Sequence, residues 1–497
     1  MPKTTSLLAA GLSVAALALT ACGGGAEQGA PAALERGEGS EAFQALMKEA
    51  REAVEDGDLA DAGAILDQAR ELEPDNPSVW VEIARLRFRG GEHQQALDAA
   101  DLALELGPRY APALLLRAQM VRDAYGLTNS LVWFEAAVEA DPNDPLALAE
   151  YAATLGDAGY YTEMLGVTRA LADIAPKDPR VLYLKAVLAA RAGKPVLAKS
   201  LVERSGLAQA GVPSALMLDA LIDLQERNFD TASQSLERLV QGQPGNARAR
   251  ELLARALWLG NRDPELIERF AAEARADEAS PYLAMLVGRS LERQGNRVAA
   301  APFLEKAYAG RSSGWVALAE REGLPEPTSR MRRLVAQERW SQSRRHSAQL
   351  ARRFPGSSDI AALSGDAALA SGNAQSALEH YRKAARIRRP WPLTVKAAAA
   401  YRDFGDPLAA DVLLARHLVS EPRNTEALLL AAERAARLED WLRVSVLLDN
   451  AITLGAGNDP RLLKLRAMAA RALGREGEAR RFERMTWDLH PRLLPQG

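Results

Sequence analysis

Five prolines share one register along this chain, and their spacing constrains the fold more than any other feature of the sequence. Pro74, Pro108, Pro142 and Pro176 follow one another at intervals of 34 residues, and Pro244 lies two intervals further on. Small residues keep the same phase: Gly57, Gly91, Gly159 and Gly193, and Ala62, Ala96, Ala198 and Ala232. A constant period of about 20 to 50 residues is the signature of a repeat architecture, whose units pack only on their neighbours.

The composition and the apolar spacing indicate that each unit is helical. Apolar residues recur at intervals of three and four, the helical period, and no run alternates Val, Ile and Thr as a strand would. Aromatic residues make up 5% of the chain, and alanine and leucine dominate the other apolar residues. Glycine can turn the chain between two helices, and proline ends the second helix of a unit. The sequence therefore predicts an all-α repeat protein.

One unit carries a residue pattern that is specific to a family. Residues 77–110 have a bulky residue, small residues, a glycine and a proline at fixed positions: Trp80, Ala84, Gly91, Ala96, Ala103 and Pro108. This pattern resembles the tetratricopeptide repeat (TPR) family, with about 34 residues and two antiparallel helices per repeat. The resemblance implies a TPR-like α-solenoid, a right-handed superhelix of about 13 repeats. We place the unit starts near residues 43, 77, 111, 145, 179, 213, 247 and 281, then 324, 358, 391, 425 and 460.

A phase shift of about nine residues divides the repeats into two arrays. We expect about eight repeats in residues 43–314, a seam at 315–323 that forms a short extra helix, and about five repeats with a C-terminal cap in 324–497. Two units are weak, because 179–212 lacks the proline end and 247–280 has Asn261 where glycine is typical. Since repeats contact only their neighbours, each array should fold alone.

The N-terminus carries the pattern of an export signal. Lys3 precedes an apolar stretch at residues 6–21, which is shorter than the roughly 20 residues of a membrane-spanning helix. It ends in Leu19-Thr20-Ala21-Cys22, which resembles the lipobox of bacterial lipoproteins. The resemblance implies a signal peptide at 1–21, lipid attachment to Cys22 and a flexible linker at 22–42. Gly23, in place of Asp, favours the inner leaflet of the outer membrane, facing the periplasm.

Alternatives to this interpretation remain. An ordinary secretory signal with an unrelated cysteine fits the same residues, and retention at the inner membrane stays open.

No catalytic motif is found in the sequence. The five histidines are scattered and none lies in an HExxH motif, and there is no GxSxG, GxxxxGK[ST] or strand-linked GxGxxG motif. We therefore expect no enzyme activity, cofactor, metal or small-molecule substrate.

Charge is distributed unevenly along the chain. Residues 23–76 hold 14 acidic and 4 basic residues, whereas residues 330–402 hold 4 acidic and 15 basic residues. The second region can be a real basic surface, or simply the outward face of helices in an Arg-rich protein. The export signal argues against nucleic acid, so anionic lipid, acidic polysaccharide or acidic protein fits better.

The resemblance also suggests where a partner binds. In TPR proteins the first helix of each repeat lines the concave side, and residues three and four apart share one helical face. The corresponding candidate groove residues are Arg85, Phe88, Arg89, Arg122, Tyr183, Arg191, Arg255, Trp258, Tyr282, Met285, Arg289 and Arg293. Their guanidinium groups would hold carboxylates, and replacing Arg85, Arg122 and Arg255 with Glu should leave stability nearly unchanged. Alternatively, these residues are only the solvent-exposed face of an Arg-rich solenoid and bind no partner.

These features together predict a non-catalytic, lipid-anchored scaffold that binds other proteins of the cell envelope. Lipid-anchored TPR proteins occur in exopolysaccharide export or synthesis and in pilus or secretin assembly. A polysaccharide- or peptide-binding protein that acts alone, or a non-catalytic subunit of a peptidoglycan enzyme, fits the same features.

Overall fold

The computed structural model describes residues 39–276, 279–309 and 326–489. In these ranges the chain forms 26 α-helices and no β-strand, so the all-α prediction is confirmed. The helices before residue 310, the first array, are α2 (Glu41–Asp56), α3 (Leu59–Leu72), α4 (Pro77–Arg89), α5 (His93–Leu106), α6 (Ala111–Tyr125), α7 (Leu127–Ala140), α8 (Pro145–Ala158), α9 (Tyr161–Ile174), α10 (Pro179–Arg191), α11 (Pro195–Ser205), α12 (Pro213–Gln225), α13 (Phe229–Gly242), α14 (Ala247–Leu259), α15 (Asp263–Arg275), α16 (Pro281–Arg293) and α17 (Arg297–Tyr308). The helices after residue 325, the second array, are α18 (Glu326–Ala336), α19 (Trp340–Arg353), α20 (Ser358–Ala370), α21 (Ala374–Ala385), α22 (Trp391–Asp403), α23 (Pro407–Ser420), α24 (Thr425–Arg437), α25 (Trp441–Ala451), α26 (Pro460–Ala472) and α27 (Glu476–Leu489).

Consecutive helices pack in pairs, from α2 with α3 to α26 with α27, which gives thirteen pairs in the described ranges. We call the first helix of each pair the A helix and the second the B helix. Every A helix begins within two residues of its predicted unit start. The prolines of the 34-residue register lie in the loops that follow B helices, where their missing N–H costs nothing. The predicted solenoid of helix pairs is therefore confirmed.

Local chemistry explains why the A helices begin where they do. Pro77 is the first residue of α4, and its fixed φ angle suits that position. The side chain of the preceding Asn76 accepts a hydrogen bond from the backbone N–H of Ser78, at 3.1 Å. Asp144 caps α8 in the same way, with its carboxylate 2.8 Å from the backbone nitrogen of Leu146. These caps satisfy N–H groups that have no partner inside a helix.

Each turn from an A helix to its B helix holds one residue in the left-handed region of backbone conformation. Nine of the thirteen are glycines, with φ between 68° and 95°, and glycine adopts this region without steric cost. The other four turns hold side-chain-bearing residues, with φ between 54° and 64°: Arg227, Asn261, Glu338 and Glu439. The weak unit at 247–280 thus keeps the turn geometry although it lacks the glycine.

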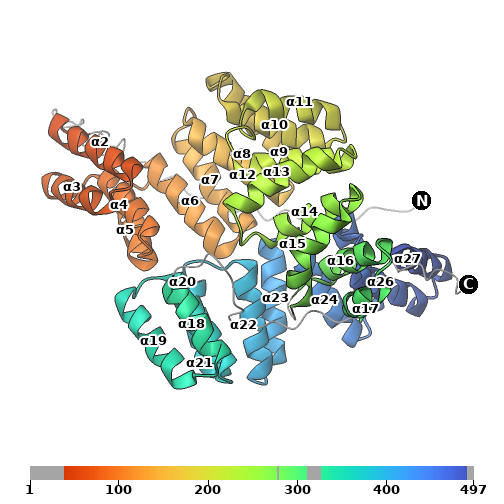
Figure 1. Ribbon diagram of the computed structural model, residues 1–497. Helices are drawn as coiled ribbons and strands as arrows, with labels where there is room; N and C mark the ends of the chain where they lie inside the picture. The colour runs from red at the N-terminus through yellow and green to blue at the C-terminus, as the bar shows by residue number, and fades with distance from the viewer. Residues whose placement is uncertain (1–38, 277–278, 310–325, 490–497) are drawn as a thin grey trace, which may run out of the picture.

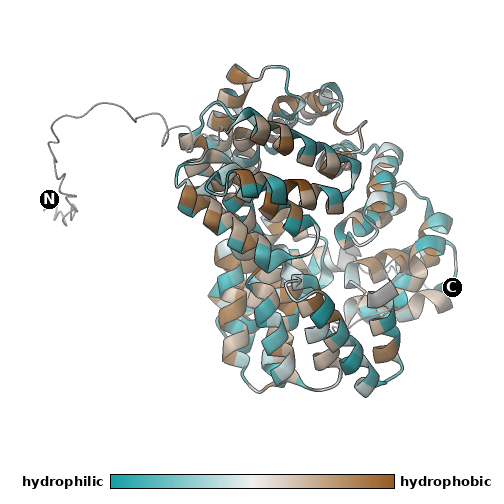
Figure 2. Ribbon diagram, turned by 90° about the vertical axis from the view of Figure 1, so that its left-hand side faces the viewer, coloured by the Kyte–Doolittle hydropathy of each residue, from teal (hydrophilic) through white to brown (hydrophobic). Residues whose placement is uncertain are grey.

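The core runs between the paired helices along the whole array. Ala84, Ala96 and Ala103 are fully buried, and their small side chains let an A helix and a B helix approach closely. Larger buried side chains such as Phe43 and Leu66 belong to a core cluster that extends from α2 to α6. Figure 2 shows hydrophobic and hydrophilic residues interspersed along the helices, as amphipathic helices require.

The two arrays lie side by side, which the sequence did not predict (Figure 1). Hydrogen bonds join residues that are 262 to 294 positions apart in the sequence. At the last pair of the first array, α16 and α17 also contact α26 of the second array. The expectation that repeats contact only their sequence neighbours is therefore wrong for this chain. The predicted signal peptide, Cys22, most of the linker and the seam at 315–323 lie outside the described residues.

Three loops of the second array meet three turns of the first, and we call this set of contacts the junction. Residues 356–358 meet the start of α5, where the backbone N–H of Ser358 donates to Nδ1 of His93 at 3.1 Å. The other two contacts follow at intervals of about one repeat along the second array. Residues 388–391 meet the end of α6, and residues 419–424 meet the start of α7 and the turn before α9.

The second and third junction contacts are specific hydrogen bonds and ion pairs. The backbone N–H of Arg389 donates to the carbonyl oxygen of Asp123 at 3.0 Å, and Arg388 Nε lies 3.6 Å from Asp123 Oδ2. Further along, the backbone N–H of Leu127 donates to Glu421 Oε1 at 3.2 Å. Thr128 Oγ1 donates to the carbonyl oxygen of Val419 at 3.1 Å. The junction therefore pairs the edge of one array with the edge of the other.

Candidate partner-binding sites

Arg122, predicted to line a partner groove, is used inside the protein. It lies on α6, and its Nη1 donates to Glu150 Oε2 at 2.9 Å and to Thr154 Oγ1 at 3.0 Å. Both partners belong to α8, the A helix of the next pair. The guanidinium also lies over the ring of Phe134, 5.4 Å from its centroid. This arginine joins two successive repeats, and little of its charge is free for a partner.

Two other predicted groove arginines also have internal partners. Arg85 Nη1 lies 3.1 Å from Glu82 Oε1 on the same helix. Arg293 Nη2 lies 2.5 Å from Asp263 Oδ1, and it also donates to the carbonyl oxygen of Trp258 at 2.8 Å. The same guanidinium covers the Trp258 ring, 5.1 Å from its centroid. Arg293 thus holds the turn of the preceding repeat, where Asn261 replaces glycine.

The apolar members of the predicted groove differ in their burial. Met285 is 2% exposed and packs in the core, so it is not a groove residue in this conformation. Tyr183 and Trp258 are half-buried against core clusters. Burial raises the pKa of Tyr282 to about 12, so its hydroxyl stays neutral at physiological pH. Phe88 is half-buried, with the Arg388 guanidinium of the second array 5.9 Å from its ring centroid.

The remaining predicted groove arginines do not form one continuous set. Arg89 is exposed at the end of α4. Arg191 lies over Tyr161, 5.8 Å from the ring centroid. Arg255 acts electrostatically on Tyr282, and Arg289 on Tyr308. All twelve predicted residues lie on A helices, as their spacing implies, but several are already engaged by neighbouring repeats.

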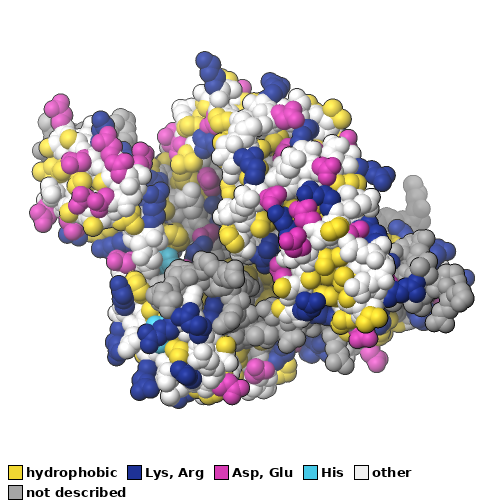
Figure 3. Space-filling model, viewed as in Figure 1, with side chains coloured by type: hydrophobic (Ala, Val, Ile, Leu, Met, Phe, Trp, Pro, Cys, Tyr) yellow, Lys and Arg dark blue, Asp and Glu magenta, His cyan; other side chains and the backbone are white. Residues whose placement is uncertain are grey.

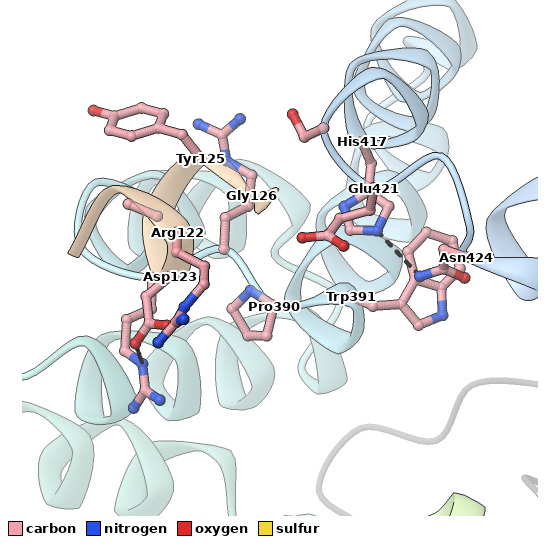
Figure 4. Close-up of a pocket in the computed structure, with 13 residues that line it drawn as sticks. Arg122, Asp123, Tyr125, Gly126, Pro390, Trp391, His417, Glu421 and Asn424 are labelled. Atoms are coloured by element: carbon pink, nitrogen blue, oxygen red, sulfur yellow. Dashed lines mark hydrogen bonds and ion pairs between the residues drawn. The ribbon is translucent and has the colours of Figure 1, made fainter. Parts of the chain in front are cut away.

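A cavity of about 410 Å³ opens at the middle of the junction. Figure 4 shows the end of α6, from Arg122 to Gly126, on one side of it, and residues of α22 and α23 and their flanking loops on the other. Gly126 has a φ of 91°, and a Cβ atom on it would lie 2.6 Å from Cβ of Ser420. Only glycine fits at this close approach of the two arrays.

The cavity holds ionisable groups from both arrays. Burial, together with the charge of Arg389, lowers the pKa of His417 to about 4, so its imidazole is neutral at pH 7. Its Nε2 lies 3.2 Å from Nδ2 of Asn424. Burial raises the pKa of Glu421, while the hydrogen bond from the Leu127 backbone lowers it. Burial and the charge of Arg416 lower the pKa of Arg389 below its usual range.

The second array also carries a surface of exposed cations that form no ion pair with a described acidic residue. We define the basic surface as eight exposed residues on or beside α18, α19 and α21: Arg330, Arg339, Arg344, Arg345, Arg352, Arg353, Lys383 and Arg386. None of them forms an ion pair with a described acidic residue. Figure 3 shows lysines and arginines gathered over this part of the molecule.

The basic surface differs from the first array in how its cations are grouped. At least twelve of the 23 arginines described in the first array form an ion pair: Arg51, Arg70, Arg85, Arg87, Arg117, Arg122, Arg180, Arg248, Arg250, Arg262, Arg269 and Arg293. The other arginines of that array are spread along its helices, whereas the eight cations of the basic surface lie on or beside three helices of the second array.

Comparison with known families is consistent with this geometry. The model of the Tetratricopeptide repeat family matches residues 47–111, 219–281 and 330–391, which include units of both arrays. Helix pairs with a 34-residue period extend between and beyond these matches. The chain is built of tetratricopeptide repeats. Proteins of this kind are generally scaffolds that bind other proteins, and this coarse role applies here.

Several solved structures of repeat proteins are similar to this chain. The pilF protein of Pseudomonas aeruginosa is 19% identical, covering 47% of this chain and 93% of that one, with a TM-score of 0.32. A tetratricopeptide repeat protein of Parabacteroides merdae is 17% identical, covering 56% and 94%, with a TM-score of 0.27. Human IFIT1, solved as a dimer with m7Gppp-AAAA, is 18% identical, covering 68% and 80%, with a TM-score of 0.37. These likenesses carry no argument about function, and no curated protein matches the sequence.

Among the described residues, no group of three or more His, Cys, Asp or Glu side chains is placed to hold a metal ion. No helix in the described ranges is both long enough and apolar enough to cross a membrane.

The junction of this tetratricopeptide repeat protein is the feature that sequence reasoning missed. One signal was present: the turn glycine of the third repeat is Gly126, one residue later than the register of Gly57 and Gly91. At that displaced glycine the second array approaches so closely, through Ser420, that no side chain would fit. The loops of the second array that form the other side of the junction have sequences typical of the loop between two repeats. Their sequences therefore did not reveal the contact.

Proposed function

We propose that this protein is a lipid-anchored docking scaffold of the bacterial cell envelope. Acyl chains on Cys22 hold it at the inner leaflet of the outer membrane, and the repeats extend into the periplasm. It recruits an acidic partner protein through the basic surface. Machines that export or synthesise exopolysaccharide, or assemble pili or secretins, are the assemblies in which we place it.

The unpaired charge of the basic surface is the observation that carries this proposal. Cations that are neutralised inside the protein gain little from a partner, whereas the basic surface keeps its full charge. Clustered charge of one sign speeds the encounter with an oppositely charged partner, and such binding weakens as salt increases. Guanidinium groups also bind carboxylates in a bidentate geometry that lysine lacks. An acidic partner therefore suits this surface better than it suits the predicted groove.

Pull-down of the full-length lipidated protein from detergent-solubilised envelope, with mass spectrometry, tests the docking surface. The triple variant Arg344→Glu, Arg345→Glu and Arg352→Glu should lose at least about tenfold in captured partner, because each reversal opposes binding. The matched control is Arg109→Glu, Arg169→Glu and Arg204→Glu, which changes the net charge equally at exposed sites elsewhere. Equal capture by the first variant and the wild type would contradict the proposal. An equal loss in the control would show that only net charge matters.

The proposed lipid attachment to Cys22 is tested separately from the docking surface. The variant Cys22→Ser should leave an uncleaved or soluble precursor, because serine cannot form the thioether. Membrane fractionation and labelling with palmitate measure the outcome. A Cys22→Ser protein that still takes up palmitate and still fractionates with the outer membrane would disprove the lipid anchor, whatever the pull-down shows.

A further inference from the structure

Arg389 is a cation without a counter-ion in the junction cavity. It precedes Pro390 in the loop between α21 and α22, and its backbone N–H is fixed on the carbonyl oxygen of Asp123. Its Nε is buried and has no hydrogen-bond partner among the described residues. Its guanidinium lies 5.9 Å from the ring centroid of Tyr125. Buried polar groups in proteins are almost always hydrogen-bonded, so an unpaired donor in a cavity calls for a ligand.

The other charged groups that line the cavity already form ion pairs or hydrogen bonds within the protein. Arg122 pairs with Glu150, and Arg388 pairs with Asp123. Glu421 accepts the backbone N–H of Leu127.

The charge around the cavity that remains unpaired is positive. His417 is neutral at pH 7 because burial lowers its pKa to about 4. Arg416, whose positive charge also acts on Arg389, is an exposed residue of α23. Neither Arg389 nor Arg416 forms an ion pair with an acidic residue in the described ranges.

We propose that the junction cavity is a binding site for an oxyanion, a carboxylate or phosphate group of a small ligand, held by the guanidinium of Arg389. The cavity volume lies within the range of about 300 to 1,000 Å³ that small-molecule sites occupy, and it suits a ligand of dicarboxylate or monosaccharide size. A guanidinium presents parallel N–H donors that match a carboxylate or phosphate. This site is independent of the basic surface and of the lipid anchor.

Because the cavity lies between the two arrays, a bound ligand also affects the contact between them. Arg389 and His417 belong to the second array, whereas Tyr125 and Gly126 belong to the first. A ligand that fills the space between them contacts both arrays. Because it binds the closed junction and not the open one, it stabilises the contact between the arrays by mass action.

The test measures thermal unfolding of the purified full-length chain in glutarate and in phosphate, at an ionic strength kept constant with sodium chloride. The wild type should gain roughly 1–3 °C in melting temperature at saturating oxyanion. The variant Arg389→Gln should gain nothing, because it lacks the charge that binds. The matched control is Arg386→Gln, an exposed arginine three residues earlier, which should respond as the wild type does. A response to only one of the two anions supports the site and identifies its chemistry.

A second measurement separates a binding arginine from a structural one. Without oxyanion, Arg389→Gln should melt at the same temperature as the wild type or above it, because it removes an unpaired buried charge. Labelling with phenylglyoxal, read by mass spectrometry, should slow at Arg389 but not at Arg386 when the oxyanion is present. An equal response of the wild type and Arg389→Gln, or no response to either anion, would overturn the proposal. A lower melting temperature of unliganded Arg389→Gln, with no protection from phenylglyoxal, would assign Arg389 a structural role.

Discussion

At Arg122, one side chain joins two successive repeats by an ion pair, a hydrogen bond and a contact with an aromatic ring. Its side chain is 29% exposed and that of Glu150 is 30% exposed, so solvent screens the pair only in part. The expectation that reversing this charge leaves stability unchanged treated the residue as fully exposed. In the structure, reversal leaves Glu150 facing a second carboxylate across the interface between repeats.

We therefore expect Arg122→Glu to destabilise the protein by about 2 kcal/mol, since breaking a partly buried pair costs more than losing an exposed one. Urea-induced unfolding measures the change. The exposed control Arg89→Glu should stay within about 0.5 kcal/mol of the wild type. Adding Glu150→Arg to Arg122→Glu should restore most of the lost stability, because it re-forms the ion pair with the charges exchanged. If the single variant is as stable as Arg89→Glu, the pair contributes nothing.

Sequence spacing predicted which helix face each candidate residue occupies, but not its partner. The 34-residue register placed Arg122 and Arg293 correctly on A helices. Their acidic partners, Glu150 and Asp263, lie 28 residues later and 30 residues earlier in the chain, on neighbouring repeats. Those offsets depend on how successive pairs stack, which one sequence without the packing does not reveal. For the same reason Met285 could be taken for a surface residue although it is buried.

At the level of elements, the turn between the A and B helices is the most constant feature of the repeat. All thirteen turns use the left-handed region, whether or not they contain glycine. The sequence predicted helix starts closely because proline and capping residues act locally. It did not predict that Arg227, Glu338 and Glu439 adopt the glycine conformation, because packing on either side of the turn imposes it. A non-glycine residue in this region costs of order 1 kcal/mol or more.

Relieving this strain should stabilise the repeats. We expect Glu439→Gly to raise the free energy of unfolding by about 0.5–1 kcal/mol, since glycine adopts a φ of 58° without steric cost. The opposite change, Gly91→Ala, should lower it by about 1 kcal/mol, although no atom lies within 4 Å of the added Cβ. Thermal and urea unfolding of both variants measure the effect. A stabilising Gly91→Ala would contradict the argument from backbone conformation.

At the scale of the whole molecule, the two arrays act as one body because the junction holds them edge to edge. Two histidines stand at its contacts, His93 at the first and His417 at the third. Burial lowers the pKa of both below the ordinary value. The unfolded chain therefore binds more protons than the folded chain at mildly acidic pH.

This difference sets the direction of the pH dependence. The contribution of these histidines to stability is fully present above about pH 6.5 and is lost as pH falls toward 4. Protonation of His93 Nδ1 also removes the acceptor for the Ser358 N–H. We expect the radius of gyration from small-angle X-ray scattering to increase, and the melting temperature to fall, between pH 6.5 and 4.5. The double variant His93→Gln and His417→Gln should respond less; an identical response would assign the change to other groups.

The spacing of the junction contacts has a mechanical consequence. A free solenoid stretches like a spring, because each repeat yields independently of all but its neighbours. Here three bonded contacts, about one repeat apart along the second array, join two such solenoids edge to edge and stiffen the molecule. If Cys22 anchors the chain and a partner binds α19, as proposed above, a pulling force between them reaches the contact at residues 356–358 before it reaches the other two. The three contacts would then break one after another, and the contact of α16 and α17 with α26 would be the last to hold the arrays together.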